Sequence, residues 1–272
     1  MSVPCTPASN ALLGEICLVG AGPGAADLIT VRGRELLSRA GAILYAGSLV
    51  STDHLAYARA DCQIADSSTM TLEEMVDWLL TAARRHPLVV RLQTGDPSLY
   101  GAMAELLPPL QQAGASTRVI PGVPSFAASA AAAQTTLTLP EVCQTVILTR
   151  VAGRTPMPER EQLQDLARHH CTLCLHLSIT LWPTIERELS AAGWSADSPV
   201  VVVHKASWPG QEQILRGTLA TMAALCQQAD IHSQSMILIG PTLQPQPLPT
   251  RSQLYHPAFG HGFRAATPHE EV

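Results

Sequence analysis

A glycine-containing turn follows a strongly apolar segment in the first half of the chain, and its residue types suit ligand binding. Residues 88–92 predict a buried β-strand, because Val89 and Val90 are β-branched and Pro87 precedes the run. The turn after it reads Gly95-Asp96-Pro97. Open α/β sheets bind ligands at the carboxyl ends of their strands, and glycine lets backbone approach a ligand closely. The turn therefore indicates a ligand site, although the same tripeptide also occurs in solvent turns without a function.

A second glycine turn strengthens this interpretation. The apolar segment 16–19 runs into Gly20-Ala21-Gly22-Pro23-Gly24, which superficially fits a dinucleotide-binding fingerprint. Two features argue against that fit. Pro23 removes an amide donor that a pyrophosphate would need, and the next predicted strand leads into Ala46-Gly47-Ser48, which offers no carboxylate to a ribose. A nicotinamide-dependent oxidoreductase is therefore the minor hypothesis.

Hydrophobic periodicity predicts alternating strands and helices around these turns. Strands are expected near 16–20, 42–46, 62–65, 88–93 and 116–120, and helices near 30–39, 51–58, 72–85 and 99–113. Thr71 and Glu74 form a capping box for the third helix. Pro108-Pro109 should kink or break the fourth helix, with Gly114 closing it. The alanine-rich residues 126–133 predict a further helix.

The second half of the chain repeats the alternation with a mixed sheet. Strands are expected near 145–150, 171–177, 199–204, 211–217 and 235–240, and helices near 160–168, 181–192 and 219–228, with an antiparallel hairpin at 211–215. The pattern predicts two α/β domains, 1–138 and 139–243. Residues 244–272 are rich in Pro, Gln, Gly and His and predict a poorly ordered tail or a surface strap.

Composition narrows the classes of partner and compartment. The chain has 272 residues, 46% of them hydrophobic, and a formal net charge of -5, which argues against nucleic acid or an anionic membrane as a partner. Seven irregularly spaced cysteines do not resemble a disulfide framework. The first residues lack the features of a secretory leader, and no segment has the roughly 18 apolar residues of a membrane span. A cytoplasmic protein is expected.

A cluster of cysteines and histidines at 169–176 invites a metal-site interpretation. Cys171 and Cys174 have the Cys-x-x-Cys spacing. In a β-strand, however, positions three apart point to opposite faces, so both thiolates cannot reach one ion. Core cysteines and strand-edge histidines are the favoured interpretation, and no metal is expected.

Five ordered motifs carry a resemblance to a known family. They are 19–24 (Val-Gly-Ala-Gly-Pro-Gly), 45–49 (Tyr-Ala-Gly-Ser-Leu), 94–101 (Thr-Gly-Asp-Pro-Ser-Leu-Tyr-Gly), 121–126 (Pro-Gly-Val-Pro-Ser-Phe) and 149–156 (Thr-Arg-x-x-Gly-Arg-Thr-Pro). Together they resemble the tetrapyrrole (corrin/porphyrin) methyltransferases over about residues 14–243. Thr94 and Ser98 resemble the corrin branch of that family, and the likeness is strongest to its precorrin-4 members. Ala25-Ala26 departs from the Gly-Asp-Pro that many relatives have in this turn.

The resemblance implies two α/β domains with S-adenosylmethionine in the cleft between them, and a homodimer. The residues that it implies at the cofactor are Pro23, Thr94, Gly95, Asp96, Ser125 and Phe126, joined from the second domain by Leu177 and Ala206. A sulfonium cofactor needs no phosphate cradle, which agrees with glycine turns that expose backbone carbonyls. Asp96 either binds the cofactor's amino group or fixes its loop by an Asx turn.

The implied reaction is methylation of carbon 11 of precorrin-4, or of its cobalt form, to give precorrin-5 in cobalamin biosynthesis. Such a substrate carries many carboxylates, which arginine binds well. Arg150 and Arg154, then Lys205, are the candidate contacts, although surface ion pairing is the ordinary role of such residues. Tyr45, Ser48 and Tyr100 are candidate neighbours of the macrocycle, and no catalytic base is identified. Another corrin-pathway C-methyltransferase, an NAD-dependent oxidoreductase and a non-catalytic tetrapyrrole carrier remain alternatives.

Overall fold

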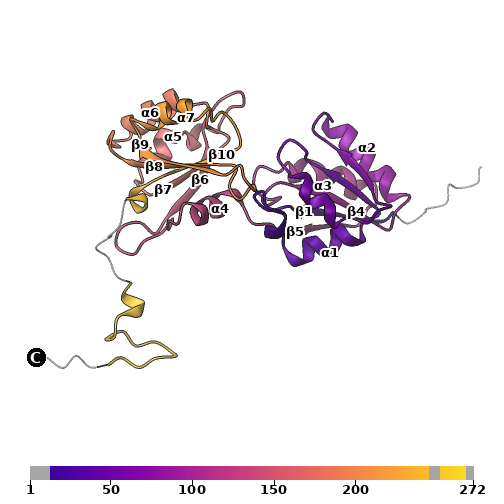
Figure 1. The fold of residues 1–272 in the computed structure, drawn as a ribbon, viewed down its shortest axis with the longest axis horizontal. Coiled ribbons are helices and arrows are strands. Elements are labelled where there is room, and N and C mark those ends of the chain that lie inside the picture. The colour runs from indigo at the N-terminus through magenta and orange to yellow at the C-terminus, as the bar shows by residue number, and fades with distance from the viewer. Residues whose placement is uncertain (1–12, 245–251, 268–272) are drawn as a thin grey trace, which may run out of the picture. The chain divides into compact units, whose positions relative to one another are not determined.

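The chain forms two compact units, each built around its own sheet. The computed structural model describes residues 13–244 and 252–267. Unit 1 extends to Ala128 and also includes the segment Lys205–Glu212, whereas unit 2 comprises Ser129–His204 and the chain from Gln213 onward. Figure 1 labels most of the helices and strands of both units.

Unit 1 contains a parallel five-stranded sheet in the order β3-β2-β4-β1-β5. Its strands are β1 (Glu15–Gly20), β2 (Ala42–Tyr45), β3 (Gln63–Asp66), β4 (Leu88–Gln93) and β5 (Thr117–Ile120). All six residues of β4 are buried, as expected of a central strand that is covered on both faces. Because the strands are parallel, the loops that follow β1, β4 and β5 leave the same edge of the sheet.

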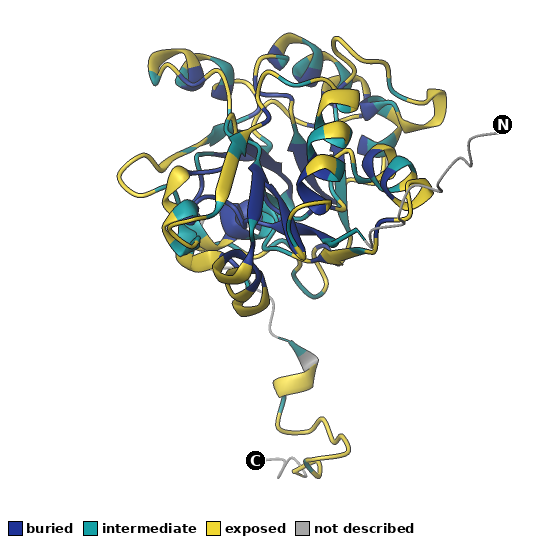
Figure 2. Cartoon of the chain, turned by 90° about the vertical axis from the view of Figure 1, so that its right-hand side faces the viewer, coloured by how far each residue is buried: buried dark blue, intermediate teal, exposed yellow. Residues whose placement is uncertain are grey.

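Helices cover both faces of this sheet. They are α1 (Val31–Arg39), α2 (Leu72–Ala83) and α3 (Met103–Gln112), with the short 3-10 helices η1 (Ala26–Leu28) and η2 (Thr52–Tyr57). Successive side chains of β1 point to opposite faces of the sheet. Cys17 and Val19 belong to the core cluster that contains α1. Ile16 and Leu18 belong to the core cluster that contains α2 and α3. In Figure 2 the central strands are dark blue and the outer helix faces are yellow, so the middle of the sheet is the buried layer.

Helix boundaries confirm one prediction from sequence and correct another. The Thr71 hydroxyl and the Glu74 carboxylate form the expected capping box of α2. Pro108 and Pro109, however, do not break α3, which continues through both prolines and begins at Met103 rather than near 99. Burial of Leu106 and Leu110 on the core side of α3 outweighs the loss of two amide donors. Gly114, with a φ of 84°, closes the helix as predicted.

Unit 2 contains a mixed five-stranded sheet in the order β6-β7-β10-β8-β9. Its strands are β6 (Val146–Arg150), β7 (Thr172–His176), β8 (Pro199–His204), β9 (Gln213–Thr218) and β10 (Ser235–Ile239). Only β6 and β7 are parallel, and the predicted hairpin is the antiparallel pair β8 and β9. The helices of the second half are α5 (Leu163–Ala167), α6 (Trp182–Ala191) and α7 (Met222–Gln228), with η3 (Glu159–Glu161), η4 (Pro241–Leu243) and η5 (Gln253–Tyr255). A further helix, α4 (Ser125–Ala132), crosses the boundary between the units.

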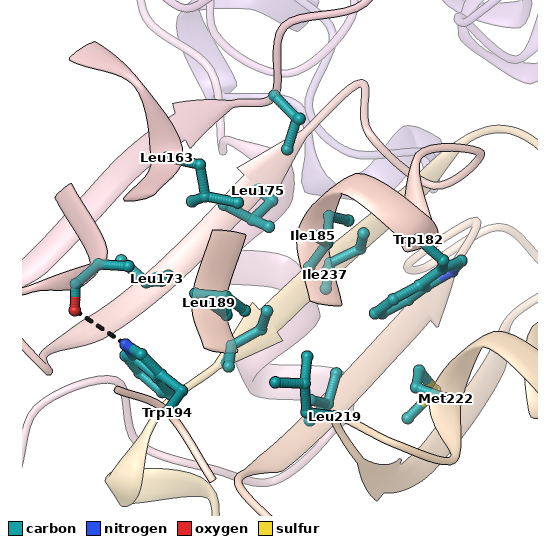
Figure 3. Packing of buried hydrophobic residues seen from close by; sticks show 14 of the residues in the cluster. Leu163, Leu173, Leu175, Trp182, Ile185, Leu189, Trp194, Leu219, Met222 and Ile237 are labelled. Atoms are coloured by element: carbon teal, nitrogen blue, oxygen red, sulfur yellow. Dashed lines mark hydrogen bonds between the residues drawn. The ribbon is translucent and has the colours of Figure 1, made fainter. Parts of the chain in front are cut away.

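The core of unit 2 lies between one face of its sheet and the helices α5, α6 and α7. Figure 3 shows Leu173 and Leu175 of β7 and Ile237 of β10 in this core, which the side chains of Trp182 and Leu189 help to fill. Trp194 buries its indole there and satisfies its Nε1 with a hydrogen bond of 2.8 Å to the carbonyl of Ala167. Cys171 belongs to this cluster, whereas Cys174, which is also buried, does not.

The architecture confirms the predicted fold class of two α/β units. Of the predicted tail 244–272, residues 245–251 and 268–272 lie outside the described residues.

The described helices contain none that is long and apolar enough to cross a membrane. Within residues 13–244 and 252–267, no group of three or more His, Cys, Asp and Glu side chains is arranged to hold a metal ion.

Burial of His176 at the end of β7 should make the stability of the protein depend on pH. Burial lowers the pKa of His176 from 6.5 to about 4. The unfolded chain therefore binds a proton that the folded protein does not, and stability falls as the pH decreases below 6.5. Between about pH 7 and about pH 5 this linkage costs the fold roughly 2 kcal/mol.

The His176→Gln variant should lose less stability between these two pH values than the unsubstituted protein, as measured by urea unfolding. The matched control is His169→Gln, which removes an exposed histidine. An equal loss of stability in the His176→Gln variant and the unsubstituted protein would contradict the prediction.

Candidate functional site

Three loops of unit 1 meet through the backbones of three glycines. Gly20 ends β1, Gly95 follows β4 and Gly122 follows β5. A Cβ at Gly122 would lie 2.1 Å from the carbonyl oxygen of Gly95, and a Cβ at Gly20 would lie 2.6 Å from the same oxygen. Gly22 and Gly95 also exchange backbone hydrogen bonds of 3.2 and 2.7 Å. No residue with a side chain fits at Gly20 or Gly122 without moving the neighbouring loop.

The Asp96 carboxylate fixes two of these loops to each other. One oxygen accepts hydrogen bonds from the amide of Ser98, at 2.8 Å, and from the Ser98 hydroxyl. The other oxygen accepts a 3.0 Å hydrogen bond from the amide of Gly122. Burial by itself would raise the pKa of Asp96, but the bonds from Ser98 and Gly122 outweigh it and hold the pKa below its ordinary value. The carboxylate is therefore ionised at neutral pH and makes the Asx turn that was one of its two expected roles.

The glycine turn after β1 contacts three further side chains. The ring of His54, which is buried, lies with Nε2 2.8 Å from the carbonyl oxygen of Ala21 and Nδ1 2.9 Å from that of Ser51. From the other half of the sequence, Ser207 and Trp208 hydrogen-bond to the backbones of Ala25 and Pro23. The helix α1 begins only at Val31, so its N-terminus does not open directly behind the glycines as a dinucleotide site requires.

The remaining predicted residues of unit 1 differ in burial and position. Thr94 is half-buried directly before Gly95, and Ser125 and Phe126 open α4 beyond the Gly122 loop. Tyr45, at the end of β2, packs against the α1 side of the core. Ser48 and Tyr100 are exposed. Ala206 is buried within the segment Lys205–Glu212, so the structure groups it and Lys205 with the Pro23 turn in unit 1.

Unit 2 contains a pocket of about 350 Å³ that brings together three predicted residues, Arg150, Arg154 and Leu177. The Arg150 guanidinium donates hydrogen bonds to the carbonyls of Thr155, at 3.1 Å, and Pro156, at 2.6 Å, and so fixes the loop after β6. Arg154 lies on that loop and is exposed, and no ion pair of its guanidinium occurs among the described residues. Arg154 therefore presents an available positive charge at the pocket.

Leu177 occupies the pocket wall in an unusual conformation. Its φ is 55° and 69% of its surface is exposed, although leucine disfavours both left-handed backbone and water. Its neighbour Ser178 holds it there: the Ser178 hydroxyl donates to the carbonyl of His176 and accepts from the amide of Val151. An exposed apolar residue that is held in a strained backbone conformation is typical of a ligand contact.

Sequence reasoning overlooked several residues that shape these sites. It did not identify the roles of His54, Ser207 and Trp208 in holding the glycine turn. Ser207-Trp208-Pro209-Gly210 does contain a turn signal, but a contact between residues more than 180 positions apart leaves no local pattern. Thr180 and Leu181, which also line the unit 2 pocket, were overlooked as well, because no motif in the sequence marks them.

Comparison with known proteins gives one consistent result. The model of the tetrapyrrole (corrin/porphyrin) methylases matches residues 15–223. The chain is 46% identical to a cobalt-precorrin-4 C(11)-methyltransferase of Priestia megaterium over 94% of this chain and 100% of that protein. It is 43% identical to a precorrin-4 C(11)-methyltransferase of Pseudomonas aeruginosa over 92% of this chain and 98% of that protein.

Solved structures agree with the sequence comparisons. A cobalt-precorrin-4 methyltransferase superposes with a TM-score of 0.83 at 45% identity, covering 89% of this chain and 100% of that chain. A uroporphyrin-III C-methyltransferase from Thermus thermophilus, solved in complex with S-adenosylhomocysteine, gives a TM-score of 0.70 at 28% identity over 84% of this chain and 98% of that chain. The matches extend over nearly the whole chain and include both sheets, and the chain therefore belongs to the tetrapyrrole (corrin/porphyrin) methylase family.

Proposed function

We propose that this protein transfers the methyl group of S-adenosylmethionine to carbon 11 of precorrin-4, or of its cobalt form, in cobalamin biosynthesis. The observation that carries the proposal is the similarity to relatives with this activity over their whole length, at 46% identity in one case. The same similarity supports S-adenosylmethionine as the cofactor, because a more distant relative was solved with S-adenosylhomocysteine bound.

The loops of unit 1 fit such a cofactor better than a dinucleotide. Backbone groups of Gly20, Gly22 and Gly95 meet closely, and the turn contains Pro23 where a pyrophosphate would need an amide. The proposed cofactor contacts in these loops are Pro23, Thr94, Gly95, Ser125, Phe126 and Ala206. Leu177 is a further proposed contact, on the strength of the family resemblance. Asp96 is assigned to fixing the loops, because its carboxylate already accepts three hydrogen bonds.

The unit 2 pocket supports binding of a polycarboxylate substrate. Arg154 offers an exposed guanidinium, which can hold a carboxylate through two parallel hydrogen bonds. Arg150 positions the loop that carries Arg154. Lys205, Tyr45, Ser48 and Tyr100 of unit 1 are the further proposed substrate contacts.

The proposed reaction needs little acid or base catalysis by the protein. The sulfonium of the cofactor supplies a methyl group that is already activated, and the electron-rich ring carbon is the nucleophile. The described residues therefore act chiefly by binding and aligning the reactants and by excluding water. We assign no catalytic base.

The decisive experiment incubates the protein with S-adenosylmethionine and either precorrin-4 or cobalt-precorrin-4, and analyses the product by mass spectrometry and NMR. The expected product carries one additional methyl group at carbon 11, and the preferred substrate shows whether cobalt is already present. Methylation at a different carbon would indicate another C-methyltransferase of the corrin pathway. Tight pigment binding without methylation would indicate a carrier, and calorimetric binding of NAD in place of S-adenosylmethionine would indicate an oxidoreductase.

Replacing Arg154 with alanine should raise the KM for the tetrapyrrole about fivefold to tenfold, because an exposed charge-assisted contact contributes about 1 kcal/mol. The affinity for S-adenosylhomocysteine should change less than twofold in calorimetry. The matched control is Arg160→Ala, which removes another exposed arginine outside the pocket. An unchanged KM would remove Arg154 from the proposed site.

Replacing Gly122 with alanine should weaken S-adenosylhomocysteine binding at least tenfold, because the new Cβ would force the Gly95 loop away. The control is Gly114→Ala, at a glycine with a φ of 84° and open space around it. That control should lose about 1 kcal/mol of stability through backbone strain and keep its cofactor affinity. Equal affinities in the two variants would show that the glycine contact does not shape the cofactor site.

Two further proposals concern assembly and compartment. We propose a homodimer, on the strength of the family resemblance, and light scattering of the purified protein tests it. We also propose a cytoplasmic location. Its support is that Cys17, Cys62, Cys143, Cys171, Cys174 and Cys226, the cysteines in the described part of the chain, are all free thiols, as is usual in a reducing compartment.

A further inference from the structure

The segment Lys205–Glu212 joins β8 to β9 of the unit 2 sheet, yet its contacts place it in unit 1. There it meets the turn Pro23-Gly24-Ala25, which precedes η1. The Ser207 hydroxyl accepts a 3.0 Å hydrogen bond from the amide of Ala25, and Trp208 Nε1 donates a 3.2 Å hydrogen bond to the carbonyl of Pro23. The two bonds link parts of the chain that are 182 and 185 residues apart.

The Trp208 ring also covers the glycine at the centre of the turn. A Cβ at Gly24 would lie 2.2 Å from Cδ1 and 2.6 Å from Nε1 of the indole, and the three atoms nearest to that Cβ all belong to Trp208. Gly24 does not adopt a left-handed backbone, so the indole, rather than backbone strain, is what excludes a side chain there. The turn and the ring are therefore in direct contact.

Contacts within the segment Lys205–Glu212 hold the Trp208 ring in place. The Ser207 amide donates to the Glu212 carboxylate at 2.6 Å, and the Lys205 ammonium donates to the Gln211 side chain at 2.6 Å. That ammonium also lies 5.4 Å from the centroid of the Trp208 ring, within the range of a cation–π interaction. Lys205 and Ser207 both have positive φ, of 46° and 66°. Such a backbone is unfavourable for both residues and persists where surrounding contacts hold it.

The turn depends on outside support because regular structure does not hold it. It lies between the end of β1 at Gly20 and the start of η1 at Ala26, and Pro23 has no amide to donate. The groups that fix the Pro23 carbonyl and the Ala25 amide are side chains of Ser207 and Trp208. Without them, the turn would have more conformations available, and a ligand would have to select one of them.

We propose that Trp208 and Ser207 are positioning residues for the cofactor: they hold the Pro23–Ala25 turn in the conformation that binds S-adenosylmethionine. The proposal rests on the proposed function, since it assigns this turn to the cofactor site. Trp208 acts through the turn, and the consequence is a specific loss of cofactor affinity when its ring is removed.

Calorimetric titration of the full-length protein with S-adenosylhomocysteine tests the proposal. The Trp208→Ala variant should bind about tenfold more weakly. Trp208→Phe keeps a ring over Gly24 but loses the Nε1 donor, and Ser207→Ala loses one acceptor, so each should bind about threefold to fivefold more weakly. The matched control is Trp78→Phe. Trp78 lies in α2 and packs against the core cluster of α2 and α3, so this variant should keep the Kd of the unsubstituted protein.

A double-mutant cycle separates positioning from general destabilisation. Gly24→Ala should weaken binding because its methyl group meets the indole, whereas Gly24→Ala in the Trp208→Ala background should add less than a twofold loss. At saturating S-adenosylmethionine, the KM of the Trp208→Phe variant for the tetrapyrrole should stay within about twofold of the unsubstituted value.

The outcomes distinguish this inference from the proposed function. If the unsubstituted protein does not bind S-adenosylhomocysteine, the proposed function fails and the inference fails with it. If it binds, and if Trp208→Ala, Trp208→Phe and Ser207→Ala all keep its Kd within twofold, only the positioning role is overturned. Additive losses in the Gly24 and Trp208 cycle would also overturn it.

Discussion

The close approach of three backbones at Gly20, Gly95 and Gly122 is the constraint on which the unit 1 site depends. The Gly95 carbonyl lies where a Cβ of either of the other two glycines would fall. The strands β1, β4 and β5 are neighbours in one parallel sheet, so their following loops leave the same edge and compete for the same space. Because Gly20 and Gly122 have no Cβ atoms, all three loops can meet. The Asp96 carboxylate then holds two of these loops together.

This constraint explains why the site relies on backbone rather than charged side chains. The Asp96 carboxylate contacts the convergence, and its oxygens accept hydrogen bonds from Ser98 and Gly122. The Trp208 indole likewise donates a hydrogen bond to the carbonyl of Pro23. The groups that hold the loops are thus committed to that task. A sulfonium cofactor, which carries its own activation, suits such a site better than a pyrophosphate, which needs several free amides.

Local patterns in the sequence predicted the helices and strands. Features that depend on contacts between residues distant in sequence could not be predicted in this way. The apolar segment 16–19 and the capping box at Thr71 and Glu74 are local signals, and the structure contains both the strand β1 and the capping box of α2. The break considered at prolines 108–109 does not occur, because burial of neighbouring leucines lets the helix continue. The segment Lys205–Glu212 was assigned to the second half of the chain by position alone, although its contacts are with residues of unit 1.

The two units use different means to fix their proposed binding residues, and this difference bears on how specificity could change. In unit 1, each loop is restrained by another loop, so a substitution at Gly122 or Asp96 disturbs more than one of them. In unit 2, Arg150 fixes its own loop through carbonyls five and six residues away, and Arg154 projects from that loop without an ion pair among the described residues. Substitution of Arg154 therefore leaves the restraints of the loop intact. If the proposed sites hold, changes in the tetrapyrrole that is accepted should arise more readily at such positions than at the glycine turns, where the proposed cofactor binding would be lost first.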